Sequence, residues 1–278
     1  MLGGVAWERF PIDPYPGPRS ADQILGGRRL TEATVLADER TTTPEGVPFA
    51  ESRMAGFICS QTVLVDVTPS PERIAEALAQ TVSVLGCDLV VFLDVGGDAL
   101  AHGDEAGLAS PLCDAVMLAA AVRMAPEIAV IGAVYGAGCD GELTVDEVLD
   151  QISDLAGAGA MLGSWGLTPA VATQIEAAAA VIPTEASLLG AHCARGDTRD
   201  VLIRGGRRMV KLSPVGAITF FFDPVAAFEA ALPLANAVAG AADLNAANET
   251  LRRMGVSTEL ELERNRAKQV AGDLTAGD

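Results

Sequence analysis

The chain has 278 residues, of which 50% are hydrophobic and 4% aromatic, and its formal net charge is −18 at pH 7. This length fits one α/β domain over residues 1–278, with a core of Ala, Val and Leu because aromatic side chains are scarce. The acidic balance, which no basic stripe offsets, argues against a general affinity for nucleic acid or an anionic membrane surface.

The five cysteines are dispersed, form no CxxC pair and are odd in number. They indicate neither a disulfide framework nor a zinc site, and they favour a reducing compartment. The N-terminus lacks the basic and apolar regions of a signal peptide, and charges or prolines interrupt the long apolar stretches. We therefore expect a cytoplasmic protein with a small-molecule substrate, without nucleic acid or membrane as a partner, and compatible with a homo-oligomer.

Residues 1–20 contain four prolines, which exclude a helix and favour an extended strap. Arg9 and Arg19 in this strap are candidates to bind a substrate carboxylate or phosphate through paired hydrogen bonds. The alternative is structural, with the two arginines pairing with Glu8 and Asp13 to fasten the strap.

Two strands are predicted next, at residues 31–37 and 61–67. A helix is predicted over residues 69–85 because Ser70 can cap it, a proline follows, and apolar residues recur along one face. Gly86 is expected to end this helix.

The stretch 88–114 changes from apolar to acidic and glycine-rich and then to a helix start, and the predicted site is built around it. LVVFL at 89–93 predicts a strand buried on both faces. A loop of acids and glycines follows, and Ser110 with Pro111 then predicts a helix that runs to about Met124. In an open parallel sheet, this loop lies at the carboxyl end of the strand, where α/β proteins bind ligands.

The pattern is repeated farther along. EIAVIGAVY at 127–135 predicts a second buried strand, GAGCDGEL at 136–143 a second glycine-rich acidic loop, and Thr144 with Glu147 the capping box of a second helix. Residues 148–163 are predicted to continue as helix and then as an Ala/Gly-rich turn.

The remainder predicts helices that begin at Thr168 and at Thr184. Short strands are expected at 201–203, 209–212 and 217–222, forming a hairpin-like edge with Arg207 and Arg208 in its turn. Helices are expected at 224–239, interrupted at Pro233, and at 244–254 and 258–270, followed by a disordered tail from about 272 to 278. This alternation predicts a doubly wound, mostly parallel, Rossmann-like sheet with helices on both faces.

The two acidic loops should be neighbours because consecutive strands of such units are usually adjacent. Clustered carboxylates repel one another, so some are held protonated and suit acid/base catalysis, or they coordinate a hard ion such as Mg²⁺ or Mn²⁺. Two alternatives remain open: the loops bind the hydroxyl or amine groups of a ligand without catalysis, or their acids only stabilise turns and helix starts.

Candidate site residues follow from this arrangement. His102 among the carboxylates suits a proton shuttle, although a loop histidine is commonly a solvated surface group. The catalytic candidates are Asp94, Asp98, His102, Asp104 and Glu105. The substrate-binding candidates are Arg9, Arg19, Gly96, Gly97, Ser110, Gly138, Asp140 and Glu142. The metal-ligand candidates are Asp94, Asp98 and Asp140.

Other motifs give weaker indications. Gly136, Gly138 and Gly141 match the spacing of the GxGxxG dinucleotide fingerprint, but no acid is found for the ribose at the end of a following strand. No GxxxxGK[ST], HExxH or GxSxG motif is present, so P-loop, zincin and α/β-hydrolase chemistry are not supported. Cys193 beside His192 is not predicted to be a catalytic dyad, because adjacent helical residues point in different directions.

Three stretches resemble an uncharacterised family known as domain of unknown function 1152: WERFPIDPYPGPRS at 7–20, DVGGDALAHGDEAGLASPLCDA at 94–115 and GAGCDGEL at 136–143. The resemblance implies a Rossmann-like α/β fold and supports the position of the site, without naming a substrate. Members usually begin with an additional strand and a GGGGD-type loop before the tryptophan motif, which implies a late start site or a missing first unit here. DVGGDALAHGD also resembles, over a few residues, the D-G-G-N-x-x-G-x-G loop of D-glutamate cyclase-like proteins.

Together these observations lead us to expect a small-molecule metabolic enzyme. A specialised biosynthetic pathway is the setting considered. The enzyme would use the clustered carboxylates, with or without Mg²⁺ or Mn²⁺, for acid/base lyase, cyclase or isomerase chemistry on a small polar carboxylate-, amine- or phosphate-bearing substrate. The alternatives are a non-catalytic metabolite-binding or enzyme-partner protein, and an enzyme that depends on a nucleotide cofactor.

Overall fold

The strands form two separate four-stranded sheets and one hairpin in a computed structural model that describes residues 1–276. The first sheet has the order β1-β4-β3-β2. Its strands are β1 (Gly3–Val5), β2 (Arg28–Arg29), β3 (Thr34–Ala37) and β4 (Thr62–Val65). Only the β1–β4 pair is parallel, and β3 runs antiparallel to both β4 and β2.

The second sheet has the order β5-β6-β10-β7 and carries the central stretch of the sequence. Its strands are β5 (Leu89–Val95), β6 (Ala129–Tyr135), β7 (Met161–Gly166) and β10 (Ile218–Phe222). β5 and β6 are parallel in the expected register, whereas β10 is antiparallel to both β6 and β7. The chain is therefore a mixed α/β protein, and its described strands do not form the expected single, mostly parallel sheet.

The position of β10 explains this difference. Residues 217–222 were predicted at a hairpin-like edge, but β10 lies in the middle of the second sheet, between β6 and β7. The Phe222 ring packs over Gly132 of β6, where a side chain would collide with it, and Phe222 is buried. β7 was not predicted, because its sequence MLGSWG contains two glycines and has little β-propensity. The other two predicted strands do form a hairpin, β8 (Asp200–Ile203) with β9 (Arg208–Lys211).

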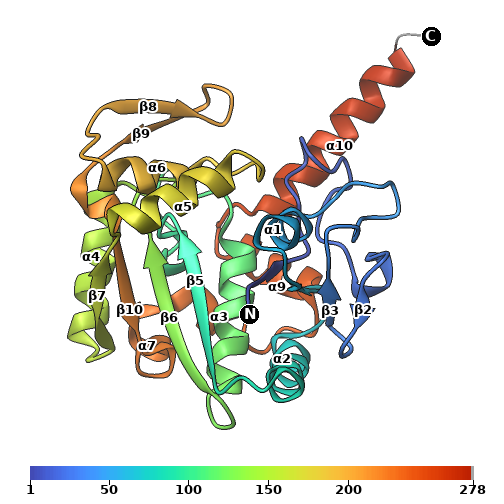
Figure 1. Cartoon of the computed structure of the whole chain (residues 1–278), viewed down its shortest axis with the longest axis horizontal. Coiled ribbons are helices and arrows are strands. Elements are labelled where there is room, and N and C mark those ends of the chain that lie inside the picture. The colour runs from blue at the N-terminus through green and yellow to red at the C-terminus, as the bar shows by residue number, and fades with distance from the viewer. Residues whose placement is uncertain (277–278) are drawn as a thin grey trace.

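One face of the second sheet is covered by helices. In Figure 1, α3 (Pro111–Met124) lies behind β5 and β6, and α7 (Pro224–Ala231) lies behind the lower end of the sheet. α3 also contacts α2 (Pro71–Leu85), α8 (Pro233–Val238) and α9 (Leu244–Arg253). Buried side chains from both sheets and from these helices form one continuous hydrophobic core.

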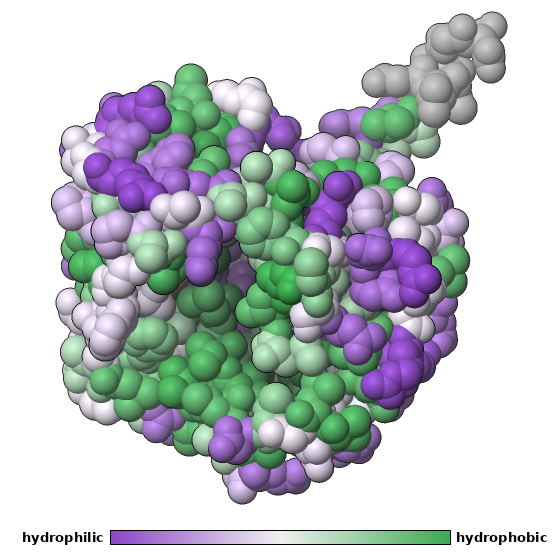
Figure 2. Space-filling model, viewed as in Figure 1, coloured by the Kyte–Doolittle hydropathy of each residue, from purple (hydrophilic) through white to green (hydrophobic). Residues whose placement is uncertain are grey.

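The opposite face of the same sheet is largely open, which is a second difference from the doubly wound arrangement. Leu93 of β5 is 55% exposed and Trp165 of β7 is 72% exposed. Figure 2 shows hydrophobic residues gathered on the lower part of this face. Here α5 (Pro169–Ala179) and α6 (Ala186–Ala194) lie across one end of the sheet and leave the middle uncovered (Figure 1).

Helix boundaries agree with the capping residues in most places. The Ser70 and Thr144 side chains accept backbone hydrogen bonds at the starts of α2 and α4 (Val145–Gly157), and Gly86 ends α2 in the left-handed conformation. Pro233 separates α7 from α8 as expected. α1 (Ala50–Ile58) was not predicted, and the short 3-10 turns are η1 (Ala21–Gln23), η2 (Asp98–Leu100) and η3 (Pro214–Ala217).

The last helix, α10, spans Glu259–Ala276 and extends away from the body of the protein (Figure 1). The disordered tail expected from about 272 to 278 overlaps the end of this helix, and residues 277–278 lie outside the described part of the chain. Within residues 1–276, none of the helices combines the length and the apolar character that crossing a membrane requires.

Candidate functional site

The two acidic loops meet at the ends of β5 and β6. The amide of Gly96 donates to the carbonyl of Tyr135 (2.9 Å), and the amide of Gly138 donates to the carbonyl of Gly96 (2.7 Å). Gly96 has a φ of +137°, and the Asp140 carboxyl group fills the space that a β-carbon at Gly96 would take. The proximity predicted from the strand order is therefore present in the structure.

Four aspartates and one glutamate gather around this junction. Carboxylate oxygens of Asp94, Asp98 and Asp114 lie within 4.8 Å of one another, and so do those of Asp98, Asp140 and Glu142. Asp98 belongs to both groups and is only 6% exposed. Two of the three predicted metal ligands, Asp94 and Asp98, share one group, and the third, Asp140, joins Asp98 in the other.

Burial raises the pKa values of the four aspartates, and the charges of neighbouring acids add to this for Asp98, Asp114 and Asp140. Burial is the main cause in each case: it raises the pKa of Asp94 to about 6 and that of Asp140 to about 7. The pKa values of Asp98 and Asp114 are raised well above the usual range by burial and then by the charge of Asp94. The cluster therefore retains protons near neutral pH unless a cation replaces them.

Glu142 differs from the four aspartates because an arginine, a hydroxyl group and two backbone amides bind its carboxylate. Its oxygens accept hydrogen bonds from the amides of Ala109 (2.7 Å) and Ser110 (2.8 Å) and from the Ser110 hydroxyl. Arg208 also donates to it from 2.8 Å. Glu142 thus fastens the start of α3 to the second loop, and Ser110 donates to Glu142 and makes no side-chain capping bond of its own.

Asp114, in the first turn of α3, is the member of the cluster that sequence reasoning missed. It closes the stretch 88–114 and sits four residues after the predicted N-cap, Ser110. One helical turn therefore brings its side chain to the same end of α3 as the loop. That spacing was the available signal, but acids in a first turn usually serve only the helix dipole.

Two cavities adjoin the cluster. The larger, of about 950 Å³, is lined by Ser110, Asp114 and Glu142, and the smaller, of about 570 Å³, is mostly apolar and is lined by Asp94 and Asp114. Asp114 and its neighbour Cys113 therefore border both cavities. Burial and nearby acids raise the pKa of the Cys113 thiol, so it does not offer a ready thiolate nucleophile.

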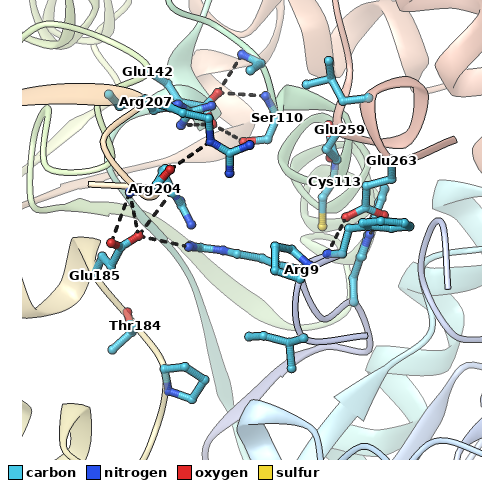
Figure 3. A pocket seen from close by; sticks show the side chains of 18 of the residues that line it. Arg9, Ser110, Cys113, Glu142, Thr184, Glu185, Arg204, Arg207, Glu259 and Glu263 are labelled. Carbon is cyan, nitrogen blue, oxygen red and sulfur yellow. Dashed lines mark hydrogen bonds and ion pairs between the residues drawn. The ribbon is translucent and has the colours of Figure 1, made fainter. Parts of the chain in front are cut away.

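The wall of the larger cavity also carries arginines. Arg9 comes from the strap, and Arg204, Arg207 and Arg208 come from the β8–β9 hairpin. Figure 3 shows Arg9 extended across the cavity toward Glu185, with Arg204 near the same glutamate. Sequence reasoning placed Arg207 and Arg208 in the hairpin turn but gave them no role, because their distance in space from the acidic loops is set by the tertiary fold.

Glu259, at the start of α10, closes another side of the larger cavity. Its carboxylate accepts hydrogen bonds from the amides of Leu112 (3.1 Å) and Cys113 (2.7 Å), so α10 caps α3. Burial raises the pKa of Glu259 to about 7 despite these hydrogen bonds.

Three predicted catalytic residues lie outside this site. His102 and Asp104 are exposed and line neither of the two cavities. The His102 ring lies 3.7 Å from Asp154 on α4. Glu105 accepts hydrogen bonds from the amides of His102 and Gly103 and from Gln151, so it holds the loop in place. The structure therefore places His102, Asp104 and Glu105 outside the lining of both cavities, and their catalytic roles remain predictions.

Arg19 also needs a correction. It is 1% exposed, makes two hydrogen bonds of 2.7 Å to Asp13 and a salt bridge of 2.7 Å to Glu45, and stacks on Tyr15. Its Nε and Nη2 atoms bind these acids and its side chain is buried, so it fastens the strap and is not positioned for a substrate. The structural alternative considered for the strap arginines therefore holds for Arg19 and not for Arg9.

The glycines of the site have distinct tasks. Gly97 donates from its amide to Asp94 (2.8 Å), and a β-carbon there would collide with Val148. Gly138 has a φ of +74°, which favours glycine, and its amide joins the two loops. These positions shape the cluster, and direct contact of their amides with a ligand remains a prediction.

The fold and the site define a mixed α/β protein with a carboxylate-lined cavity, and the chain belongs to the family described as "Protein of unknown function (DUF1152)". The family model matches residues 1–267, which confirms the resemblance seen in the three sequence motifs. Neither the curated proteins nor the solved structures give a significant match to the chain.

Proposed function

We propose that this protein is a small-molecule metabolic enzyme that uses the cluster around Asp98 for acid/base chemistry on an anionic substrate. The observation that supports this most is the position of Asp98, which belongs to two three-carboxylate groups beside a cavity of about 950 Å³ that also carries arginines. Such a cavity can hold a small metabolite between groups that exchange protons and groups that bind a negative charge.

The raised pKa values suit proton transfer. A carboxyl group with a pKa near 6 to 7, as for Asp94 and Asp140, is partly protonated at neutral pH, so one acid can remove a proton while a neighbour returns one. Elimination, cyclisation and isomerisation need only such a base and such an acid. We therefore propose lyase, cyclase or isomerase chemistry, with Asp114 as an additional catalytic residue because it borders both cavities.

The donor set also fits a divalent ion. Carboxylate oxygens are the ligands that Mg²⁺ and Mn²⁺ prefer, and three lie close together in the group of Asp94, Asp98 and Asp114. Glu142 is a poor ligand by comparison, because its oxygens are occupied by amides and by Arg208. A bound ion would polarise a substrate oxygen and would lower the repulsion within the cluster.

The test is the effect of Mg²⁺ and Mn²⁺ on thermal stability in wild type and in Asp98→Asn. We expect either ion to raise the melting temperature of the wild type, since a ligand at about 100 times its Kd adds about 2.7 kcal/mol of stability. Asp98→Asn should lose most of that increase, because it removes the one carboxylate that belongs to both groups. Asp150→Asn, an exposed acid on α4, is the matched control and should respond like the wild type.

The proposal would be contradicted if neither ion stabilised the wild type between pH 6.5 and 8.5 and a compound turned over by the wild type were turned over equally fast by folded Asp98→Asn. An effect of the ions that persists in Asp98→Asn would reject the metal part alone.

We also propose that the unit β5–α3–β6 is a remnant of a Rossmann-like arrangement. Its two parallel strands and connecting helix support that relationship, together with the loops at their carboxyl ends.

A further inference from the structure

Three arginines of the larger cavity have little to neutralise them. Arg9, Arg204 and Arg207 line this cavity, and Glu185 lies 3.9 Å from the guanidinium groups of Arg9 and Arg204. We infer that these three guanidinium groups form a binding site for a phosphate group of the substrate. This inference rests on the proposed function in that it names the substrate class.

The residues before and after Arg9 in the strap are hydrogen-bonded to the rest of the protein. The Trp7 indole donates to Glu263 (3.0 Å), and Glu8 accepts from the amide of Ala50 (2.6 Å). The amide of Phe10 donates to Glu263 as well (3.3 Å). The backbone is therefore fixed, whereas the Arg9 side chain is 47% exposed and its ion pair with Glu185 is long, at 3.9 Å.

The hairpin turn presents the other two arginines. Arg204 adopts a φ of +55°, and Gly205 and Gly206 also have positive φ, so the turn is tight. Arg204 and Arg207, at the two ends of the turn, both line the cavity. The amide of Arg204 donates to both oxygens of Glu185 (3.1 and 3.2 Å), while its guanidinium is 3.9 Å from that carboxylate. The Nε atom of Arg207 donates to the carbonyl of Arg204 (2.9 Å). The two terminal nitrogens of Arg207 have no hydrogen-bond partner among the described side chains and backbone groups.

Several arginines elsewhere in this acidic protein are paired more closely with acids. Arg252 makes hydrogen bonds of 2.8 and 2.9 Å to Glu249, and Arg195 makes bonds of 3.0 and 3.1 Å to Glu176. Arg208, also in the cavity, is committed to Glu142 at 2.8 Å. The guanidinium groups of Arg9, Arg204 and Arg207 are paired more loosely than these and line a cavity, so they keep donors for an incoming anion.

The charge balance favours a phosphate over a single carboxylate. The three guanidinium groups and Glu185 together leave about two positive charges, which match the charge of a phosphate ester near neutral pH, about −1.5 to −2. Arg266 and Glu263, which also line the cavity, carry opposite charges and do not change this balance. A carboxylate carries one charge and is satisfied by one bidentate arginine. Burial and the positive charge of Arg208 both lower the pKa of Arg9. A bound anion would offset this repulsion between the two guanidinium groups.

The remaining lining of the cavity suggests how a substrate lies in it. Asp114 and Glu259 border the same cavity as the three arginines. A molecule bound by its phosphate at the arginines would thus extend its other end toward the carboxylates, where the proposed chemistry takes place.

The experiment is a titration of the protein with inorganic phosphate, followed by ³¹P NMR or calorimetry in metal-free buffer with a chelator. We expect saturable binding to the wild type and about 10- to 100-fold weaker binding for Arg9→Ala or Arg207→Ala, since a charge-assisted hydrogen bond contributes about 1.5 to 3 kcal/mol and each 1.4 kcal/mol is tenfold in affinity. The double variant should not saturate. Arg253→Ala, an exposed arginine on α9 paired with Glu249, is the matched control and should bind like the wild type.

Two results would overturn the inference: phosphate binding that is absent in the wild type or unchanged in the folded double variant, or acetate and succinate that displace phosphate at equal concentration. Asp98→Asn separates this inference from the proposed function. If it loses the response to Mn²⁺ and still binds phosphate, both ideas are supported; if the wild type responds to Mn²⁺ and does not bind phosphate, only the phosphate site is rejected.

Discussion

Gly96 shows how closely single residues set the geometry of the site. Its φ of +137° is strained for any residue with a side chain, and the Asp140 carboxyl group occupies the place of a β-carbon. Gly163 in β7 has a similar φ of +131°, but nothing lies within 4 Å of its β-carbon position. The two glycines therefore share the backbone strain and differ in the space around them.

We predict that Gly96→Ala destabilises the protein more than Gly163→Ala does. Both variants should lose about 1 to 3 kcal/mol from backbone strain, and only Gly96→Ala should in addition displace Asp140 and weaken the response to Mn²⁺. Urea denaturation measures the first effect and thermal shift with Mn²⁺ the second. Equal destabilisation of the two variants, with equal responses to Mn²⁺, would show that the close approach of Asp140 to Gly96 does not matter.

At the same scale, the sequence was informative where chemistry follows local order. Asp94 and Asp140 could be located because each follows a recognisable strand, and adjacent strands bring their ends together. Asp104 and Glu105 were placed in the site for the same reason, but they follow the 3-10 turn η2 and line neither cavity. Arg204 and Arg207 could not be assigned, because their role depends on where a distant hairpin packs.

At the scale of elements, α1 is connected to β1 through a buried acid. The Glu51 carboxyl group lies against Gly4 of β1, and its Oε2 atom is buried without a hydrogen-bond partner among the described residues. Burial raises the pKa of Glu51 to about 7. The protonated form is thus the one that suits the contact between the two elements.

We predict that Glu51→Gln removes a part of the pH dependence of stability. The folded protein binds more protons at Glu51 than the unfolded chain does between about pH 4.5 and 7, so the contribution of this group to stability is present below that range and is lost as pH rises through about 7. At pH 8 the variant should be more stable than the wild type by about 1 to 3 kcal/mol, and at pH 4 nearly equal. Urea denaturation at both values measures this, with Glu39→Gln, an exposed acid, as control. A wild type that is as stable as the variant at pH 8 would contradict it.

Helices were easier to predict than strands for a physical reason. The ends of a helix are marked by local capping residues. Ser70 and Gly86 cap α2 and Thr144 caps α4, each where it was predicted. A strand is defined by its partner, which is distant in sequence. β10 was recognised as a strand, but its place between β6 and β7 depends on the packing of Phe222 over Gly132, which sequence patterns do not reveal.

At the scale of the whole molecule, the two separate sheets share one core. Leu36 and Val63 of the first sheet belong to the same buried cluster as Val134 and Phe222 of the second, and the buried side chains of α3 contribute to it between them. Cys139, which is 1% exposed, precedes Asp140 in the second loop, and that loop is hydrogen-bonded to Gly96. Unfolding of either sheet should therefore open the site.

We predict that the chain unfolds as one cooperative unit, in keeping with a single domain. In Trp165→Phe, the fluorescence of Trp7 reports on the strap beside the first sheet, and labelling of the Cys139 thiol reports on the site. Both signals should change at the same urea concentration as the far-UV circular dichroism, because the loss of a shared core removes the burial that stabilises each part.

Cys59, which is exposed, should be labelled at all concentrations and serves as the control. If Cys139 became reactive well before the Trp7 signal changed, the second sheet and its acidic loops would form a separate unit, and the cavity between the strap and the hairpin would open without global unfolding.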